Sequence, residues 1–234
     1  MDSSKYLVPS LVLSLAFIIG SFLLGSKWVE SRTPERYVTV KGLSERKVKS
    51  NSAWYSINTQ FGANNTQEIQ TQIAWLEKEI KSYLTKYKFT EDEINVASIN
   101  INANNYENAT SKYNANVSIS VNTDKIEKVQ AASKSISDLI SKGILVQTDN
   151  WAAGPKYYFT EFKTIKTDMI AEATKEAKKS ANEFAKNSGS TVGKIKRANQ
   201  GVFQILPGNQ TQENEVFFVD KWIRVVSTFD YYLE

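Results

Sequence analysis

The sequence predicts an α+β protein in which helices cover one face of antiparallel sheets, preceded by one N-terminal transmembrane helix. Strand-like segments with alternating apolar residues occur mostly in pairs, and helical segments separate them in the order ββαββα and then βαββ. Few single βαβ crossovers, which would imply a parallel sheet, are present. A long uncharged run near the N-terminus predicts the membrane helix.

The uncharged run extends over residues 6–26, between Lys5 and Lys27. As a helix rising 1.5 Å per residue it would be about 32 Å long, close to the thickness of a bilayer core. Its apolar residues surround the helix axis, and Trp28 follows where interfacial aromatic residues are common. We therefore predict a membrane anchor and linker over residues 1–32, with Lys5 favouring a cytoplasmic N-terminus. A cleaved signal peptide is the alternative.

The remaining residues, 33–234, are numerous enough for one large domain with a sizeable core. Hydrophobic residues make up 41% of the chain and aromatic residues 12%, which argues against global disorder. We predict one α+β domain, with a division into halves of about 33–150 and 151–234 as a variant.

Local periodicity predicts the elements of the first half. Thr66 is the expected N-cap of the first helix, whose apolar residues recur at steps of three and four. The acidic turn at 90–93 ends this helix, and the asparagine-rich segment 102–108 is the expected tip of a hairpin. The predicted elements are strands over 37–42 and 48–61, a helix over 67–87, and hairpin strands over 94–106 and 113–121.

Helix caps place the elements of the second half. Asp124 and Glu127 have the spacing of a capping box and predict a second helix that ends at Gly143. A third helix is predicted over 165–188, with Gly189 as its stop. Extended segments are predicted over 144–151, 157–162, 192–206 and 216–233.

The composition restricts the chemistry available to the chain. It contains no histidine and no cysteine, which excludes Ser-His-Asp and Cys-His catalysis, disulfides and histidine-based zinc sites. The net charge of +4 comes from interleaved charges of both signs, so no nucleic-acid partner is expected. Gly189, Gly193 and Gly201 are too widely spaced for a phosphate-binding loop. No cofactor, metal site or catalytic residue is predicted.

Two polar motifs are candidate reactive or metal-binding sites. Ser44 and Lys47 have a Ser-x-x-Lys spacing that can support catalysis without histidine when both lie on one side of a helix. Here they fall in a strand-turn context, so we interpret the match as chance. Glu91, Asp92 and Glu93 lack the alternating oxygen ligands and the glycine of a calcium loop, and a solvated turn is the expected structure.

A row of small residues follows one side of the third helix at steps of four. Such a row lets a neighbouring backbone come close. We expect it to pack on the protein's own sheet, with a helix–helix contact between protomers as the alternative. The row consists of Met169, Ala173, Ala177, Ala181 and Ala185.

Two clusters of aromatic residues could stack on sugars or bases, although such residues are more often sheet core and edge residues. One cluster is Tyr157–Phe159 with Phe162, and the other is Phe217 and Phe218 with Trp222.

Several segments together resemble a known family. Residues 38–46 read Val-Thr-Val-Lys-Gly-Leu-Ser-Glu-Arg, and residues 169–174 read Met-Ile-Ala-Glu-Ala-Thr. Residues 198–203, Ala-Asn-Gln-Gly-Val-Phe, and 221–226, Lys-Trp-Ile-Arg-Val-Val, continue in the same register. Over about residues 36–234 the chain resembles SIMPL-domain (DUF541) proteins, in particular their membrane-anchored bacterial branch.

The resemblance implies an exported envelope protein that faces the periplasm or the outside. The family has no agreed catalytic residues, so none carries over. Related members are associated with envelope stress and outer-surface antigens, and oligomeric assemblies fit the family. One departure concerns Asn51 and Ser52, where this branch often has an aspartate and an apolar residue.

We therefore expect a non-enzymatic bacterial cell-envelope protein, held in the inner membrane by a single helix. Its SIMPL-like domain is expected to self-associate or to bind another envelope component, with a role in envelope stress as one setting. A ligand-binding module for glycans or small apolar molecules is the alternative. A hydrolase that uses Ser44 and Lys47, or paired carboxylates, is a third hypothesis.

Overall fold

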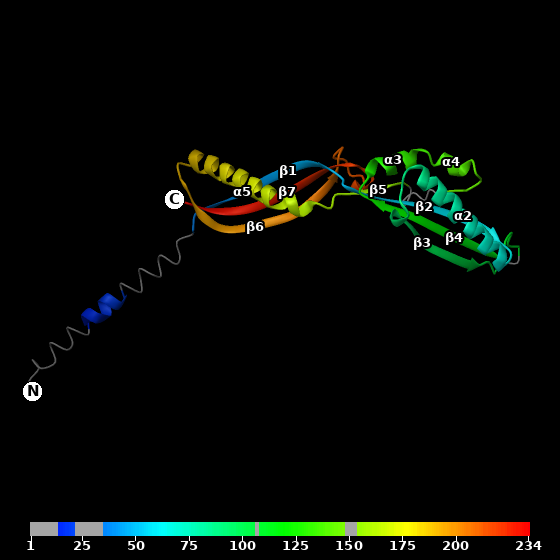
Figure 1. Cartoon of the computed structure of the whole chain (residues 1–234). Coiled ribbons are helices and arrows are strands. Elements are labelled where there is room, and N and C mark those ends of the chain that lie inside the picture. The colour runs from blue at the N-terminus through cyan, green and yellow to red at the C-terminus, as the bar shows by residue number, and fades with distance from the viewer. Residues whose placement is uncertain (1–13, 22–34, 106–107, 148–153) are drawn as a thin grey trace, which may run out of the picture. The chain divides into compact units, whose positions relative to one another are not determined.

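The computed structural model describes residues 14–21, 35–105, 108–147 and 154–234 (Figure 1). Residues 14–21 are helical, but most of the predicted anchor lies outside the described residues. Within the described part of the chain, no helix is both long and apolar enough to cross a membrane. The anchor, the domain boundary at residue 33 and the division near residue 150 stay predictions.

The described residues form an α+β fold with two sheets of strand order β1-β7-β6 and β3-β4-β2-β5 (Figure 1). The order of the elements confirms the predicted succession of paired strands and helices. The strands are β1 (Tyr37–Lys49), β2 (Ser52–Ala63), β3 (Ile94–Ala103), β4 (Tyr113–Thr123), β5 (Lys156–Tyr158), β6 (Val192–Pro207) and β7 (Asp220–Leu233). The helices are α2 (Thr66–Lys86), α3 (Ile126–Lys134), α4 (Ser137–Ile140) and α5 (Phe162–Asn187), with 3-10 turns η1 (Glu91–Glu93) and η2 (Glu215–Phe217).

The chain divides into two compact units. One unit holds residues 178–198 and 229–234 together with the described residues up to Val40, and the other holds 41–177 and 199–228. In the first unit, Thr191 and Glu234 exchange both backbone hydrogen bonds, so β6 and β7 run antiparallel. The second unit contains the whole four-stranded sheet.

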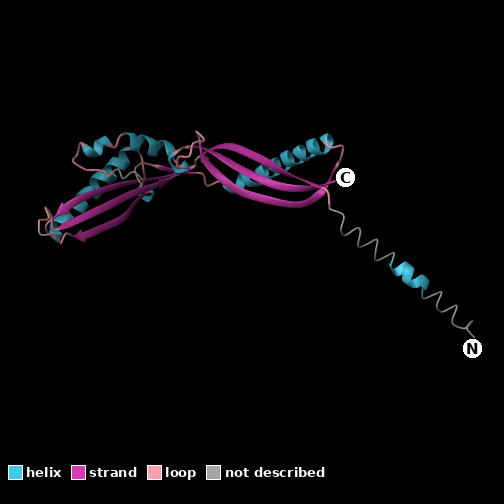
Figure 2. Cartoon of the chain, turned by 180° about the vertical axis from the view of Figure 1, so that it is seen from behind, coloured by secondary structure: helices cyan, strands magenta, loops and turns pink. Residues whose placement is uncertain are grey.

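The four-stranded sheet is antiparallel and carries helices α2, α3 and α4 on one face (Figure 2). Alternate residues of β2 and β4 point toward the helices, and Ile57 pairs with Ile119 in the middle of the sheet. These two side chains and Ile80 of α2 are at most 1% exposed and belong to one core. Burying each of them contributes about 2–3 kcal/mol.

Helix α5 packs closely on β1 and β7. Met169 and Ala173 share a small core with Ile223 and Val225 of β7. Every member of the small-residue row is buried, with exposures from 0% at Met169 to 2% at Ala185. The row therefore packs inside the protomer, as the sequence predicted, and it leaves no surface for the alternative contact between protomers.

The prediction of one continuous helix over residues 124–143 is wrong, because the helix is interrupted where α3 ends and α4 begins. In a continuous helix the Ala132 carbonyl would accept from the amide four residues ahead. Here it accepts a hydrogen bond from the Ser135 amide at 3.0 Å and another from the buried Tyr83 hydroxyl of α2. The tight last turn and the tyrosine together end the helix.

Two predicted helix starts differ in the structure. Asn65, not Thr66, caps α2, because the Asn65 Oδ1 accepts from the Glu68 amide at 2.9 Å. The capping box at Asp124 and Glu127 is absent, since Lys125 is the N-cap of α3 and no side chain caps it. The predicted stops Gly143 and Gly189 are confirmed, with left-handed φ angles of 83° and 72°.

Strand boundaries also differ from those predicted. β1 continues unbroken to Lys49, so the segment predicted as a strand over 48–61 is the end of β1 followed by β2. Of the strand predicted over 144–151, the described part forms one bridge, between Val146 and Thr59; β5 pairs with β2 at residues 52–54 instead.

Two residues predicted in strands lie in helical turns. Phe162 begins α5 and packs edge-to-face on Phe203, with ring centroids 4.8 Å apart. Val216 lies in η2, where its amide donates to the Asn214 side chain at 3.1 Å.

Candidate functional site

The Ser-x-x-Lys spacing does not form a reactive pair, because Ser44 and Lys47 lie within β1. Residues three apart in a strand point to opposite faces. Ser44 faces inward and is 5% exposed, whereas the Lys47 side chain is 55% exposed and forms an ion pair with Asp220 at 3.1 Å. A hydrolase that uses these two residues together has no geometric support.

Ser44 instead joins a polar cluster with α5. Its Oγ donates to Glu172 Oε2 at 2.6 Å, and the Arg46 guanidinium donates to the other carboxylate oxygen at 2.5 Å. The hydrogen bond from Ser44 and the charge of Arg46 together hold the pKa of Glu172 below its ordinary value. A carboxylate whose pKa is lowered is a poor base, so the cluster joins β1 to α5 rather than activating the serine.

The opposite face of β1 is tied to β7 by Glu45, which accepts a hydrogen bond from Arg224. The segments that resemble the family, 38–46, 169–174 and 221–226, therefore meet at one place in the fold. Gly42 adds a steric condition there, because a Cβ atom on it would lie 1.7 Å from the Ala173 carbonyl oxygen. The segments that carry the family resemblance are therefore those through which β1, α5 and β7 contact one another.

In the acidic turn at residues 90–93, Glu93 has a structural role. Glu93 accepts a hydrogen bond from Thr123 at 2.5 Å and from the Thr90 amide at 2.9 Å, and it lies 3.5 Å from the Lys128 ammonium. Desolvation raises the pKa of Glu93, but these bonds and the lysine outweigh it and lower the pKa to about 2. Among the described residues no group of three or more acidic residues could hold a metal ion.

The predicted aromatic clusters are divided between core and surface. Tyr157 is 5% exposed and belongs to the core under α2, and Phe159 packs against the core under α5. Phe217 and Tyr158 are exposed, Tyr158 by 40%. Neighbouring residues of the first cluster are therefore divided between the core and the surface, while Phe218 and Trp222 of the second are half-buried.

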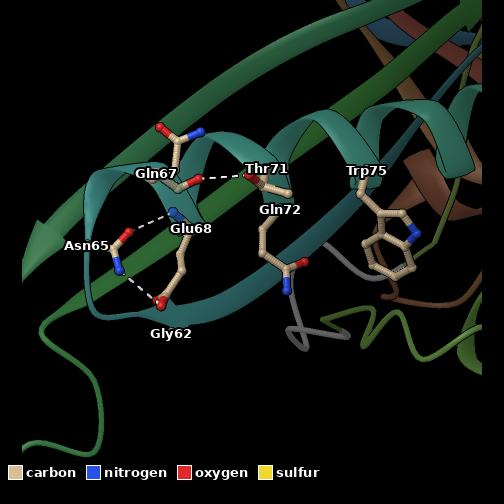
Figure 3. A pocket seen from close by; sticks show the side chains of 7 residues that line it. All are labelled: Gly62, Asn65, Gln67, Glu68, Thr71, Gln72 and Trp75. Atoms are coloured by element: carbon tan, nitrogen blue, oxygen red, sulfur yellow. Dashed lines mark hydrogen bonds between the residues drawn. The ribbon is translucent and has the colours of Figure 1, made fainter.

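One open pocket lies beside the first turns of α2, with a volume of about 740 Å³ (Figure 3). Trp75 lies at one end of it, and part of the polar lining is already bonded within the helix cap. Asn65 and Glu68 bond each other, and the Thr71 hydroxyl donates to the Gln67 carbonyl at 2.9 Å. Within the part of the chain that the structure describes, no side-chain hydrogen bond engages the amide groups of Gln67 and Gln72, so these two keep hydrogen-bonding capacity for a ligand.

A second pocket, of about 440 Å³, lies on the sheet face that is turned away from the helices. Trp54 is at its centre, with Asn122 of β4 opposite it on one side and Lys156 of β5 on the other. The Lys156 ammonium lies 5.0 Å from the centre of the Trp54 ring. The remaining lining residues are Ser52, Tyr158 and Thr160.

Asn51 shapes the rim of this second pocket. Its Oδ1 accepts from the Thr160 amide at 2.8 Å, and its Nδ2 donates to the Thr160 hydroxyl at 2.9 Å. Both residues that depart from the bacterial branch, Asn51 and Ser52, therefore lie at this pocket. The aromatic clusters in the sequence predicted Tyr158 as a candidate binding residue but not Trp54. Trp54 could have been found from the alternation along β2, which sets it apart from the buried residues Ala53 and Tyr55.

The family follows from a direct comparison. The model of the SIMPL family, described as a protein of unknown function (DUF541), matches residues 38–217. The chain therefore belongs to the SIMPL family. No curated protein matches the chain.

Proposed function

We propose that this SIMPL-family chain is a non-enzymatic protein of the bacterial cell envelope, anchored by residues 6–26, with its domain outside the cytoplasm. Its domain associates with other copies of itself, or with another envelope component, through the free edge of β3. The observation that supports this proposal most directly is the composition and exposure of that edge strand.

β3 is the outer strand of the four-stranded sheet, so one side of its backbone has no partner strand among the described residues. It has no charged residue and no proline from Ile94 to Ala103. Val96, Ile99 and Ile101 are 41–49% exposed on the face that carries α2. Edge strands of monomeric proteins are usually protected by charges, proline or short length, so an unprotected edge favours strand pairing with a partner.

The association is tested on the full chain after extraction from membranes. Size-exclusion chromatography coupled to light scattering measures the mass of the assemblies. Ile99→Lys places a charge in the apolar strip and is expected to shift assemblies toward monomer. Val202→Lys, on the edge strand of the other sheet where Val202 is 84% exposed, is the matched control and should leave the assembly unchanged. A wild-type chain that is monomeric at high concentration would falsify the proposal for self-association.

The side of the membrane on which the domain lies is tested with single introduced cysteines. The chain has no cysteine of its own, so each variant carries one reactive thiol. Val202→Cys is expected to react with a membrane-impermeant maleimide in cells whose cytoplasmic membrane is intact. Ile57→Cys, at a position 1% exposed, controls for access and should react only after denaturation. Labelling of Val202→Cys only after lysis would place the domain in the cytoplasm and contradict the proposal.

A further inference from the structure

The face of the four-stranded sheet that is turned away from the helices is covered by uncharged hydrogen-bonding side chains. On β4 every outward position is asparagine or serine, and on β2 the outward residues are serine, asparagine and glutamine around a single tryptophan. The outward residues are Asn114, Asn116, Ser118, Ser120 and Asn122 of β4 and Ser52, Trp54, Ser56, Asn58 and Gln60 of β2. β3 adds Asn95, Ser98, Asn100 and Asn102.

Much of the hydrogen-bonding capacity of this face is free. Ser56 bonds Asn58 and Ser118 near the middle of the sheet. Within the described part of the chain, no side-chain hydrogen bond engages Asn100, Asn116 or Asn122. Each asparagine amide offers two donors and one acceptor oxygen. Such a surface suits a ligand that carries many hydroxyl or amide groups and no charge.

The Trp54 pocket lies at one end of this uncharged face. Trp54 and Tyr158 supply aromatic surface, while Asn122 and Ser52 supply donors and acceptors around it. A sugar ring matches this arrangement, because its C–H faces are apolar and its edge carries hydroxyl groups. Among the described residues Lys156 is the one cation that lines the pocket, which is too little positive charge for a nucleic-acid strand.

We propose that this face binds an extended, uncharged glycan chain, with one sugar ring stacked at Trp54 and the following rings along β4 toward Asn116. Asn116 and Asn122 are six positions apart along β4, a span of about 20 Å that several sugar rings would occupy. The binding surface is distinct from the β3 edge, so glycan binding and self-association can fail independently.

Binding is measured by calorimetry on the full chain in a detergent without a sugar headgroup, with the hexamer and the dimer of β-1,4-linked N-acetylglucosamine as probes. We expect the hexamer to bind more tightly than the dimer. Trp54→Ala should weaken both by about tenfold or more, the size of effect that loss of an aromatic stacking platform produces. Trp75→Ala, at the 39% exposed tryptophan of the other pocket, is the matched control and should leave both affinities unchanged.

The Asn116→Leu variant distinguishes binding of the extended glycan along β4 from binding of the first sugar ring at Trp54. It should weaken the hexamer and leave the dimer unchanged, because only the longer probe reaches that position. Tyr158→Ala gives a second test of the aromatic end, should Trp54→Ala lower the melting temperature.

Several results would overturn the proposal. One is the absence of binding for both probes at millimolar concentration, and another is loss of binding in Trp75→Ala rather than Trp54→Ala. Tighter binding of a hexamer of galacturonic acid, abolished by Lys156→Met, would show an acidic ligand instead. Burial of this face by a second copy of the chain, seen as protection of its amides at high protein concentration, would also exclude it.

Discussion

The carbonyl oxygen of Ala173 occupies the place where a Cβ atom on Gly42 would have to lie. The separation would be 1.7 Å, and the Ala177 Cβ would be 2.9 Å away. Because the obstructing atom belongs to the helix backbone, no rotamer change can relieve the clash, and α5 would have to move away from β1. Close packing of helix on strand at this point depends on glycine in one element and alanine in the other.

Gly42→Ala is therefore expected to lower the free energy of unfolding by about 3 kcal/mol, at the upper end for an overpacked core. Urea unfolding followed by circular dichroism measures the loss. Leu43→Ala, at the neighbouring residue that is 46% exposed on the opposite face, serves as the control with a change within about 0.5 kcal/mol. Equal stability of the two variants would mean that α5 packs farther from β1 than described.

The cluster around Glu172 gives a second prediction. Ser44→Ala removes the hydrogen bond that contributes most to the low pKa of Glu172, so that pKa should rise toward its ordinary value. Carbon-detected NMR of the Glu172 carboxyl group during an acid titration measures the shift. Lys47→Ala should leave the Glu172 pKa unchanged, because Lys47 bonds Asp220 on the other face of β1. A rise in both variants would contradict the separation of the two faces.

Periodicity was sufficient to predict the features of the fold that depend on nearby residues. The row from Met169 to Ala185, the hairpin of β3 and β4 and the stops at Gly143 and Gly189 follow from spacing within one element. The break after α3 could not be predicted, because its cause is a hydroxyl of Tyr83 from another helix. Local sequence carries no information about such a partner.

The candidate site was less predictable than the fold, for a related reason. Ser44 bonds Glu172, which lies 128 residues away in the sequence. A search for short motifs therefore pairs Ser44 with the nearby Lys47, which it does not contact. Alternation in β2 separates Trp54 from the core residues around it, but it does not say which sheet face the helices leave open. That depends on where α2 and α3 pack, and only the assembled sheet brings Asn122 and Lys156 to either side of Trp54.

Glu93 should make stability depend on acid pH. Its pKa is about 2 in the folded chain and about 4.5 as a free side chain, so the unfolded chain binds its proton more readily. The resulting stabilisation is complete above about pH 4.5 and disappears as the pH falls to about 2. After allowance for partial exposure it amounts to about 1–2 kcal/mol.

Glu93→Gln should remove that part of the acid dependence, which thermal melts between about pH 2.5 and pH 7 would show as a flatter curve. Glu91→Gln, at an exposed residue of the same turn, provides the comparison and should retain the wild-type slope. An unchanged slope in Glu93→Gln would mean that other carboxylates dominate acid unfolding.

Lys221 should also make stability rise with pH, but on the alkaline side. It is 2% exposed, and its ammonium donates to the Glu215 carbonyl. Burial lowers the pKa of Lys221, and the nearby Glu215 charge offsets this only in part. Because the unfolded chain then binds the proton more tightly, the stability of the wild-type chain should rise as the pH increases through the lowered pKa toward the ordinary lysine value.

Lys221→Met keeps the length of the side chain and removes the charge, so its stability should rise less between about pH 7 and pH 9.5, a window below the ordinary pKa of tyrosine. Urea midpoints at several pH values measure the difference. Lys47→Met, at a lysine that is 55% exposed, should follow the wild-type curve. If Lys221→Met gains as much stability with pH as the wild type, Lys221 is hydrated in the folded chain and its burial does not lower its pKa.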